Sequence, residues 1–121
     1  CEPDLLLSPF AQADLLAAAS GTPLVLGGLT PAEVAAALRL SPVAVQAIPC
    51  DALGSMYART LTAMFAGEPL IATGRLERFQ CEIWLEAGAS AVAPSGVVNT
   101  SDVEDPDLAD LRRRAQGYNF G

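Results

Sequence analysis

Short apolar runs alternate with helix-like segments along the whole chain, and this rhythm constrains the fold more than any other feature. Each strand-plus-helix unit takes about 20 to 25 residues, a spacing typical of βα units around a parallel sheet that is buried on both faces. The apolar runs predict strands over residues 4–8, 23–28, 43–48, 69–74 and 89–96. The intervening patterns predict helices over residues 11–20, 31–38, 52–67, 79–87 and 101–117. The chain therefore reads as one continuous α/β array without a linker.

Signals at helix ends support these boundaries. Thr30 precedes Pro31 and lies three residues before Glu33, which predicts a capping box at a helix start. Gly21 and Gly88 are placed to end the helices before them. In the helix over 52–67, Met56, Leu61, Met64 and Phe65 are the side chains available for the inner face. Acidic residues open the segment 101–117 and arginines close it, as expected for one terminal helix matched to its dipole.

Composition excludes several functional classes. The chain has 121 residues, enough for one domain, and a formal net charge of −7, which argues against nucleic-acid or anionic-membrane partners. The arginines cluster only at 112–114, where we expect a solvated helix end. No apolar run reaches the roughly 18 residues that a membrane span requires. Cys1, Cys50 and Cys81 form neither a disulfide framework nor a metal motif, so we expect no metal, no cofactor and a cytoplasmic protein.

The absence of two residue types narrows the chemistry further. The chain has no histidine, and its seven arginines account for the entire Lys and Arg total, so it has no lysine. Imidazole bases, Ser-His or Cys-His pairs and lysine nucleophiles are therefore excluded. Without histidine, Cys50 is expected to be an inert thiol. Asp51 follows the third strand, where it is either the N-cap of the next helix, our preferred interpretation, or an acid–base group.

Five motifs, in order and in register, carry a resemblance to a known family. They are "LLLSPF" (5–10), "PLVLGGLTPAE" (23–33), "VAVQAIP" (43–49), "PLIATG" (69–74) and "LEAGASAVAPSGVV" (85–98). Together they resemble the 2-keto-3-deoxy-6-phosphogluconate (KDPG) / 2-keto-4-hydroxyglutarate aldolase family over residues 3–100. The resemblance implies a (β/α)8 TIM-type barrel, with this chain supplying about five units, strands four to eight. We accordingly expect residues 1–121 to be the C-terminal part of one barrel domain and a fragment of a longer chain; a natural half-barrel is the alternative.

The resemblance also assigns candidate binding residues. Thr73 and Gly74 match the family's Thr-Gly, where the hydroxyl binds the carboxylate of the pyruvyl group. Arg75 replaces a glycine whose backbone approaches the substrate phosphate, and is either a solvated rim residue or an anion clamp. Ser95 and Gly96 resemble a second phosphate loop with its Gly-Ser order reversed.

Gln46 is the decisive departure from the family, because it falls on the position of the Schiff-base lysine. An amide nitrogen is not nucleophilic and cannot form an imine, so class I aldolase chemistry is not possible with this chain alone. Gln46 either binds a ligand carbonyl or carboxylate without chemistry, or is an interior amide bonded to Thr73 or to a backbone carbonyl, which we favour.

These observations leave two functions open. The first is a degenerate or altered aldolase-like barrel that binds a small carboxylated or phosphorylated ligand of the 2-keto acid or sugar-phosphate class. The second is a pseudoenzyme whose barrel serves oligomer or partner assembly. The family is commonly trimeric, so a homo-oligomer is expected, or pairing with a complementary N-terminal barrel segment.

Overall fold

Five parallel strands form one sheet in the order β1-β2-β3-β4-β5, which is the order of the chain. The computed structural model describes residues 2–105 and 107–120. The strands are β1 (Leu6–Leu7), β2 (Leu24–Gly28), β3 (Ala44–Ala47), β4 (Leu70–Gly74) and β5 (Ala91–Pro94). The helices are α1 (Ala13–Ala18), α2 (Pro31–Arg39), α3 (Ser55–Met64), α4 (Arg78–Ala87), α5 (Thr100–Glu104) and α6 (Leu108–Gln116). Short 3₁₀ turns at Cys50–Ala52 and Ser95–Val97 follow β3 and β5.

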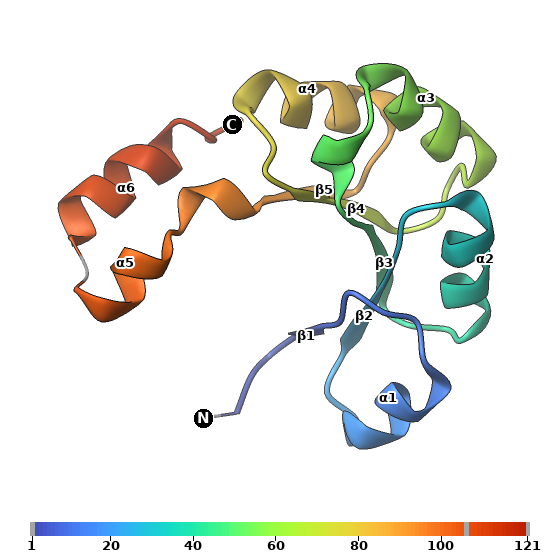
Figure 1. The fold of residues 1–121 in the computed structure, drawn as a ribbon. Coiled ribbons are helices and arrows are strands. Elements are labelled where there is room, and N and C mark those ends of the chain that lie inside the picture. Colours follow the sequence, from blue (N-terminus) through green and yellow to red (C-terminus); the bar gives the residue numbers. More distant parts are fainter. Residues whose placement is uncertain (1, 106, 121) are drawn as a thin grey trace.

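The sheet curls into a half-barrel with helices along its outer side (Figure 1). This confirms the expected fold class, a partial (β/α) barrel. Neighbouring strands are parallel throughout the sheet. Val25 on β2 pairs with Ala44 on β3, for example, and Ala47 on β3 pairs with Ala72 on β4. β1 and β5 are the two outer strands of this sheet.

The hydrophobic core lies between the outer face of the sheet and the helices. Alternate strand residues supply it, including Leu26, Val45, Ala47, Leu70 and Ala72, all at most 2% exposed. Their neighbours on the strands point to the opposite, concave face, because successive side chains of a strand alternate. The helices contribute mostly small and medium side chains and one tryptophan to the same core, among them Val34, Ala37, Ala58, Leu61, Cys81 and Trp84.

The predicted capping box and the helix end at Gly88 are confirmed, but Gly21 does not end the first helix: α1 stops at Ala18, Ala19 is its C-cap, and Ser20, with φ 52°, stands before Gly21. Thr30 and Glu33 form the reciprocal capping box of α2, with Pro31 as its first residue. Gly88 is the C-cap of α4 with φ 120°, and Gly21 lies in the turn after α1 with φ 87°; positive φ favours glycine at both positions.

The interior face of α3 differs from the prediction. Leu61 is buried and Phe65 packs against the core, but Met56 is 67% and Met64 59% exposed. The helix starts at Ser55, and its core side is formed by Ala58, Leu61 and Thr62. Met56 and Met64 fall outside that arc of the helix.

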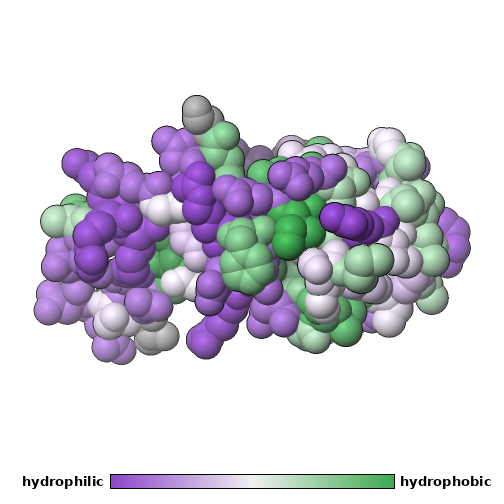
Figure 2. Space-filling view, turned by 90° about the horizontal axis from the view of Figure 1, so that it is seen from above, coloured by the Kyte–Doolittle hydropathy of each residue, from purple (hydrophilic) through white to green (hydrophobic). Residues whose placement is uncertain are grey.

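The predicted single helix over 101–117 was also wrong, since two helices replace it. Asp105, with φ −145° and ψ 81°, leaves the helical conformation, as expected for the residue before a proline. Asp107 then caps α6 by accepting hydrogen bonds from the N–H groups of Ala109 and Asp110 at 3.1 Å. Seen from above, the end of the molecule formed by α5 and α6 is mostly hydrophilic, whereas hydrophobic residues gather nearer the middle (Figure 2).

Candidate functional site

Gln46 lies on the concave face of β3 and is almost completely buried, with 3% of its surface exposed. Its register partners are Gly27 on β2 and Ile71 on β4. Nε2 donates a hydrogen bond to the backbone carbonyl of Ser8 at 2.8 Å. Oε1 is buried and has no partner among residues 2–105 and 107–120. The amide therefore bonds a backbone carbonyl, one of the two partners expected for an interior glutamine, but not Thr73.

The segment after β1 holds Gln46 in this orientation. Ser8 donates its N–H to the carbonyl of Val25, and Phe10 accepts from Gly27 N–H at 3.2 Å, so the segment runs along the edge of β2. Pro9 crosses directly over Gly27, where an added Cβ would lie 2.5 Å from the proline backbone. Only a glycine allows this approach, which brings the Ser8 carbonyl within reach of β3.

Thr73 lies on the concave face of the neighbouring strand, β4. It is two residues beyond Ile71, the register partner of Gln46, and its own partner is Ala93 on β5. Its Oγ1 is buried and likewise lacks a hydrogen-bond partner among the described residues. Gln46 and Thr73 thus place two unpaired oxygen atoms on the same face of adjacent strands.

Gly74 and Arg75 connect β4 to the loop that follows β3. The N–H of Arg75 donates to Asp51 Oδ1 at 3.0 Å. An added Cβ on Gly74 would lie 2.4 Å from the same oxygen. The preferred prediction that Asp51 caps the next helix was wrong. Gly54 is the N-cap of α3, and Asp51 lies in the preceding 3₁₀ turn, where it accepts the N–H of Arg75, the residue after β4.

Arg75 meets the loop after β5 at a polar hollow of about 340 Å³. Ser95, Gly96, Val98 and Asn99 complete its lining. Three of the sequence candidates, Arg75, Ser95 and Gly96, therefore come together. The guanidinium supplies positive charge and the serine a hydroxyl donor, which suits an anion.

Asn99 and Asp51 were not among the predicted ligand-binding residues. The sequence marks Asn99 only as a helix start, because it stands three residues before Asp102. The two residues form the capping box of α5, in which Asn99 N–H donates to Asp102 Oδ2 at 2.6 Å. Nothing local marks Asp51 as a partner of Arg75, because the two are 24 residues apart.

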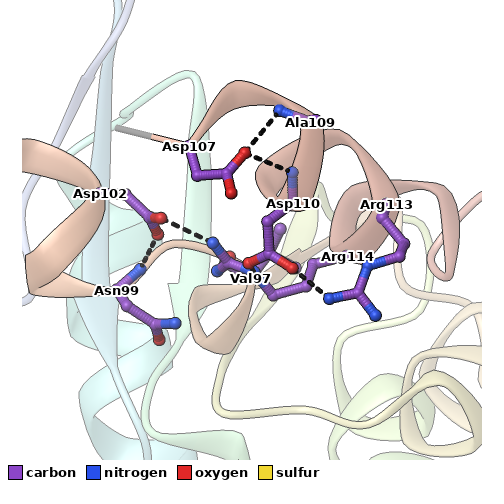
Figure 3. Close-up of polar contacts among 8 residues, drawn as sticks. All are labelled: Val97, Asn99, Asp102, Asp107, Ala109, Asp110, Arg113 and Arg114. Carbon is purple, nitrogen blue, oxygen red and sulfur yellow. Dashed lines mark hydrogen bonds and ion pairs between the residues drawn. The ribbon is translucent and has the colours of Figure 1, made fainter. Parts of the chain in front are cut away.

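Arg114, on α6, holds the segment that follows β5 through several polar contacts (Figure 3). It donates to Asp102 at 2.6 Å, to Asp110 at 2.9 Å, and to the carbonyl of Val97. The hydrogen bonds from Arg114 and from Asn99 lower the pKa of Asp102, and bonds from Arg113 and Arg114 lower the pKa of Asp110. One side chain of α6 thus ties α5 and the loop after β5 together.

Cys50 follows Pro49 and is 1% exposed. Its Sγ donates to the carbonyl of Ala47 at 2.9 Å, and burial raises the pKa of the thiol to about 12. It therefore stays protonated near neutral pH, consistent with the expected inert thiol. Cys81 is buried in the core, and Cys1 lies outside the described residues.

Tyr57 on α3 and Trp84 on α4 pack against each other. Their rings meet edge to face with centroids 6.4 Å apart, and the Tyr57 hydroxyl donates to the carbonyl of Leu29.

Among residues 2–105 and 107–120, no three His, Cys, Asp or Glu side chains gather as metal ligands would. In the same part of the chain, no helix has the length and apolar character needed to cross a bilayer.

Comparison with known proteins places the fold but not a family. No family model and no curated protein sequence matches the chain. Among solved structures, one described as native KDPGal is similar with a TM-score of 0.81 and 19% identity, over 95% of this chain and 56% of that one. A cube-shaped, highly porous protein cage designed by fusing symmetric oligomeric domains is similar with a TM-score of 0.73 and 21% identity, over 95% of this chain and 42% of that one.

A third structure, the Amycolatopsis orientalis BexX/CysO complex, gives a TM-score of 0.53 and 21% identity, over 88% of this chain and 46% of that one. The chain spans about half the length of each of these matches. At such identities the likeness concerns the fold alone. The protein is a partial (β/α) barrel whose fold is similar to that of the structure described as native KDPGal.

Proposed function

We propose that this protein is a KDPG-aldolase-like barrel without the Schiff-base lysine, and that it binds a small carboxylated or phosphorylated ligand. The site comprises Gln46, Thr73, Gly74 and Arg75 with the loop at Ser95 and Gly96. One observation carries the proposal: two buried oxygens on the concave face at the carboxyl end of the sheet, Gln46 Oε1 and Thr73 Oγ1, lack hydrogen-bond partners within the part of the chain that the structure describes. Parallel strands bind ligands at this end, and unpaired buried polar atoms in a native fold need an explanation.

The neighbouring residues suit an anion. Thr73 can donate its hydroxyl to a carboxylate, and Arg75 faces the hollow with Ser95 and Gly96 beside it. The hollow has a volume of about 340 Å³, which is large enough for a ligand of a few heavy atoms. We place the carboxylate near Thr73 and a second anionic group, such as a phosphate, near Arg75.

Imine chemistry is not part of the proposal. The seven cationic side chains are all arginines, so no side-chain amine condenses with a ketone. If the protein is still a lyase, other groups must do the chemistry. We propose that residues 1–121 form the C-terminal part of one barrel domain in a longer chain, and such groups would then lie in its other part.

Calorimetric titration of the chain with 2-keto acids, sugar phosphates and inorganic phosphate tests the proposal. Thr73→Val removes one hydroxyl with little change in shape, and Arg75→Ala removes the cation. Each should weaken binding at least several-fold, since a hydrogen bond to a charged group contributes roughly 1.5–3 kcal/mol. Thr60→Val and Arg59→Ala, on the exposed side of α3, are the matched controls and should bind like wild type. Absence of binding for every compound refutes the proposal.

A second candidate is a structural protein whose barrel serves assembly. Two observations favour it. β1 and β5 each have a strand neighbour on one side only in the described sheet, so their outer edges can pair with another strand. On the concave face, the side chains of β4 and β5 are partly exposed. A homo-oligomer, a trimer or a complementary N-terminal barrel segment would each cover these surfaces. Light scattering coupled to size-exclusion chromatography distinguishes the candidates: a stable oligomer that binds none of the anions supports assembly alone.

A further inference from the structure

The orientation of the Gln46 amide is fixed by its hydrogen bond to Ser8. A backbone carbonyl can only accept, so the amide group that faces Ser8 must be the nitrogen. The oxygen is consequently directed away from Ser8, where none of residues 2–105 and 107–120 donates to it. Gln46 is 3% exposed, so its unpaired acceptor is not freely hydrated.

A ligand at this position must therefore bring a donor. A ketone oxygen has no proton to offer, and against Gln46 Oε1 it would set two acceptors face to face. A hydroxyl group offers a proton and satisfies the amide oxygen. The residue at this strand position thus selects the chemical group that faces it.

Thr73 provides the second contact. It lies on the adjacent strand, two residues beyond the register partner of Gln46, so the two Cα atoms are roughly 8 Å apart from strand spacing and rise. Both side chains project from the same face across this gap. Its hydroxyl can donate to a carboxylate oxygen that lies next to the group facing Gln46.

We propose that the concave site recognises 2-hydroxy acids in preference to the corresponding 2-keto acids, with the 2-hydroxyl donating to Gln46 Oε1 and the carboxylate accepting from Thr73. This rests on the proposed anion-binding function and names its ligand class. The same glutamine that excludes imine formation becomes the determinant of specificity. A single buried water donating to both side chains is the competing explanation, and it predicts no such preference.

Matched pairs of acids test the inference on residues 1–121. Lactate and pyruvate, and 2-hydroxybutyrate and 2-ketobutyrate, differ only at C2. The hydroxy acid should bind about three- to tenfold more tightly, the affinity equivalent of one additional neutral hydrogen bond. Gln46→Met keeps the side-chain length without an acceptor and should remove the preference. Thr73→Val should weaken both acids of a pair alike and leave their ratio unchanged.

The outcomes separate this inference from the function on which it rests. Equal binding of the two acids, or tighter binding of the keto acid, overturns the preference and leaves anion binding intact. No binding of either acid, as the buried water predicts, overturns the inference, and the proposed function fails with it only if sugar phosphates and inorganic phosphate also do not bind. If Gln46→Met does not fold, the side-chain amide signals of Gln46 in NMR spectra of wild type decide: lactate should shift them more than pyruvate, and equal or absent shifts overturn the inference.

Discussion

The carboxylate of Asp51 accepts the backbone N–H of Arg75 at 3.0 Å, joining the loop after β3 to the end of β4. This bond fixes the backbone from which the Arg75 side chain reaches the polar hollow. It also explains why residue 74 is glycine, because any Cβ there would meet the same carboxylate. The two loops act as one unit at the carboxyl end of the sheet.

Removing the carboxylate should loosen this unit. We expect Asp51→Ala to lower the free energy of unfolding by about 1 kcal/mol, as for one partly solvated hydrogen bond, and to weaken anion binding at Arg75. Chemical denaturation and calorimetric titration measure the two effects. Asp51→Asn retains an acceptor oxygen and should behave nearly like wild type. Equal losses in both variants would show that charge, rather than the hydrogen bond, matters.

Gly74→Ala should be destabilising by about 1–3 kcal/mol, since its Cβ would lie 2.4 Å from Asp51 Oδ1 and 3.0 Å from the Cys50 nitrogen. The cost should be smaller in an Asp51→Ala background, where the nearer atom is gone. A double-mutant cycle by denaturant unfolding measures this coupling. Strictly additive effects would contradict the predicted contact.

Gly27→Ala should displace Pro9 and disturb the Ser8 carbonyl that holds Gln46. An added Cβ would lie 2.5 Å from the Pro9 backbone, so we expect a loss of about 1–3 kcal/mol in unfolding free energy. The side-chain amide of Gln46 should shift in NMR spectra. Gly54→Ser is the control: it meets nothing within 4 Å and places a favoured cap at the start of α3. A wild-type spectrum for Gly27→Ala would contradict the close approach.

Acid should release the loop after β5 from α6. The pKa values of Asp102 and Asp110 are lowered by hydrogen bonds, for Asp102 chiefly from Arg114 and for Asp110 from Arg113 and Arg114. Groups with a depressed folded-state pKa stabilise the fold above their ordinary value of 3.8, and this stabilisation is lost as the pH falls below it.

An NMR titration of the Val97 and Asn99 signals through this range measures the release. Arg114→Gln should abolish most of the transition, because it removes the donor to Asp102, to Asp110 and to Val97. Arg112→Gln, an exposed neighbour on α6, should leave it unchanged. An unaltered transition in Arg114→Gln would show that another group controls the loop.

Incubation with pyruvate and borohydride should leave every side chain unmodified. No lysine is present, so no side-chain imine forms to be trapped. Intact mass spectrometry followed by peptide mapping measures this, with a lysine-dependent class I aldolase as positive control. A reduced adduct on any side chain would overturn the argument drawn from Gln46.

The repeating pattern of the sequence determined the five parallel strands, their order and the capping of α2, because periodicity and caps are local properties. It also placed Gln46 and Thr73 within strands and Arg75 and Ser95 at strand ends, and their part in ligand binding stays a prediction. The break between α5 and α6 was missed, although the chain has a proline at 106. The exposure of Met56 and Met64 was missed because the boundary and rotation of α3 depend on its packing.

Only the tertiary structure decided how these residues are paired. The bonds of Gln46 to Ser8 and of Asp51 to Arg75 join positions 38 and 24 residues apart, and no local pattern encodes them. The same holds for the oxygens of Gln46 and Thr73 that have no partner among the described residues, because whether an atom is paired depends on everything that surrounds it. Sequence periodicity sets which face a side chain occupies; the curvature of the sheet and the path of the loops set what it meets there.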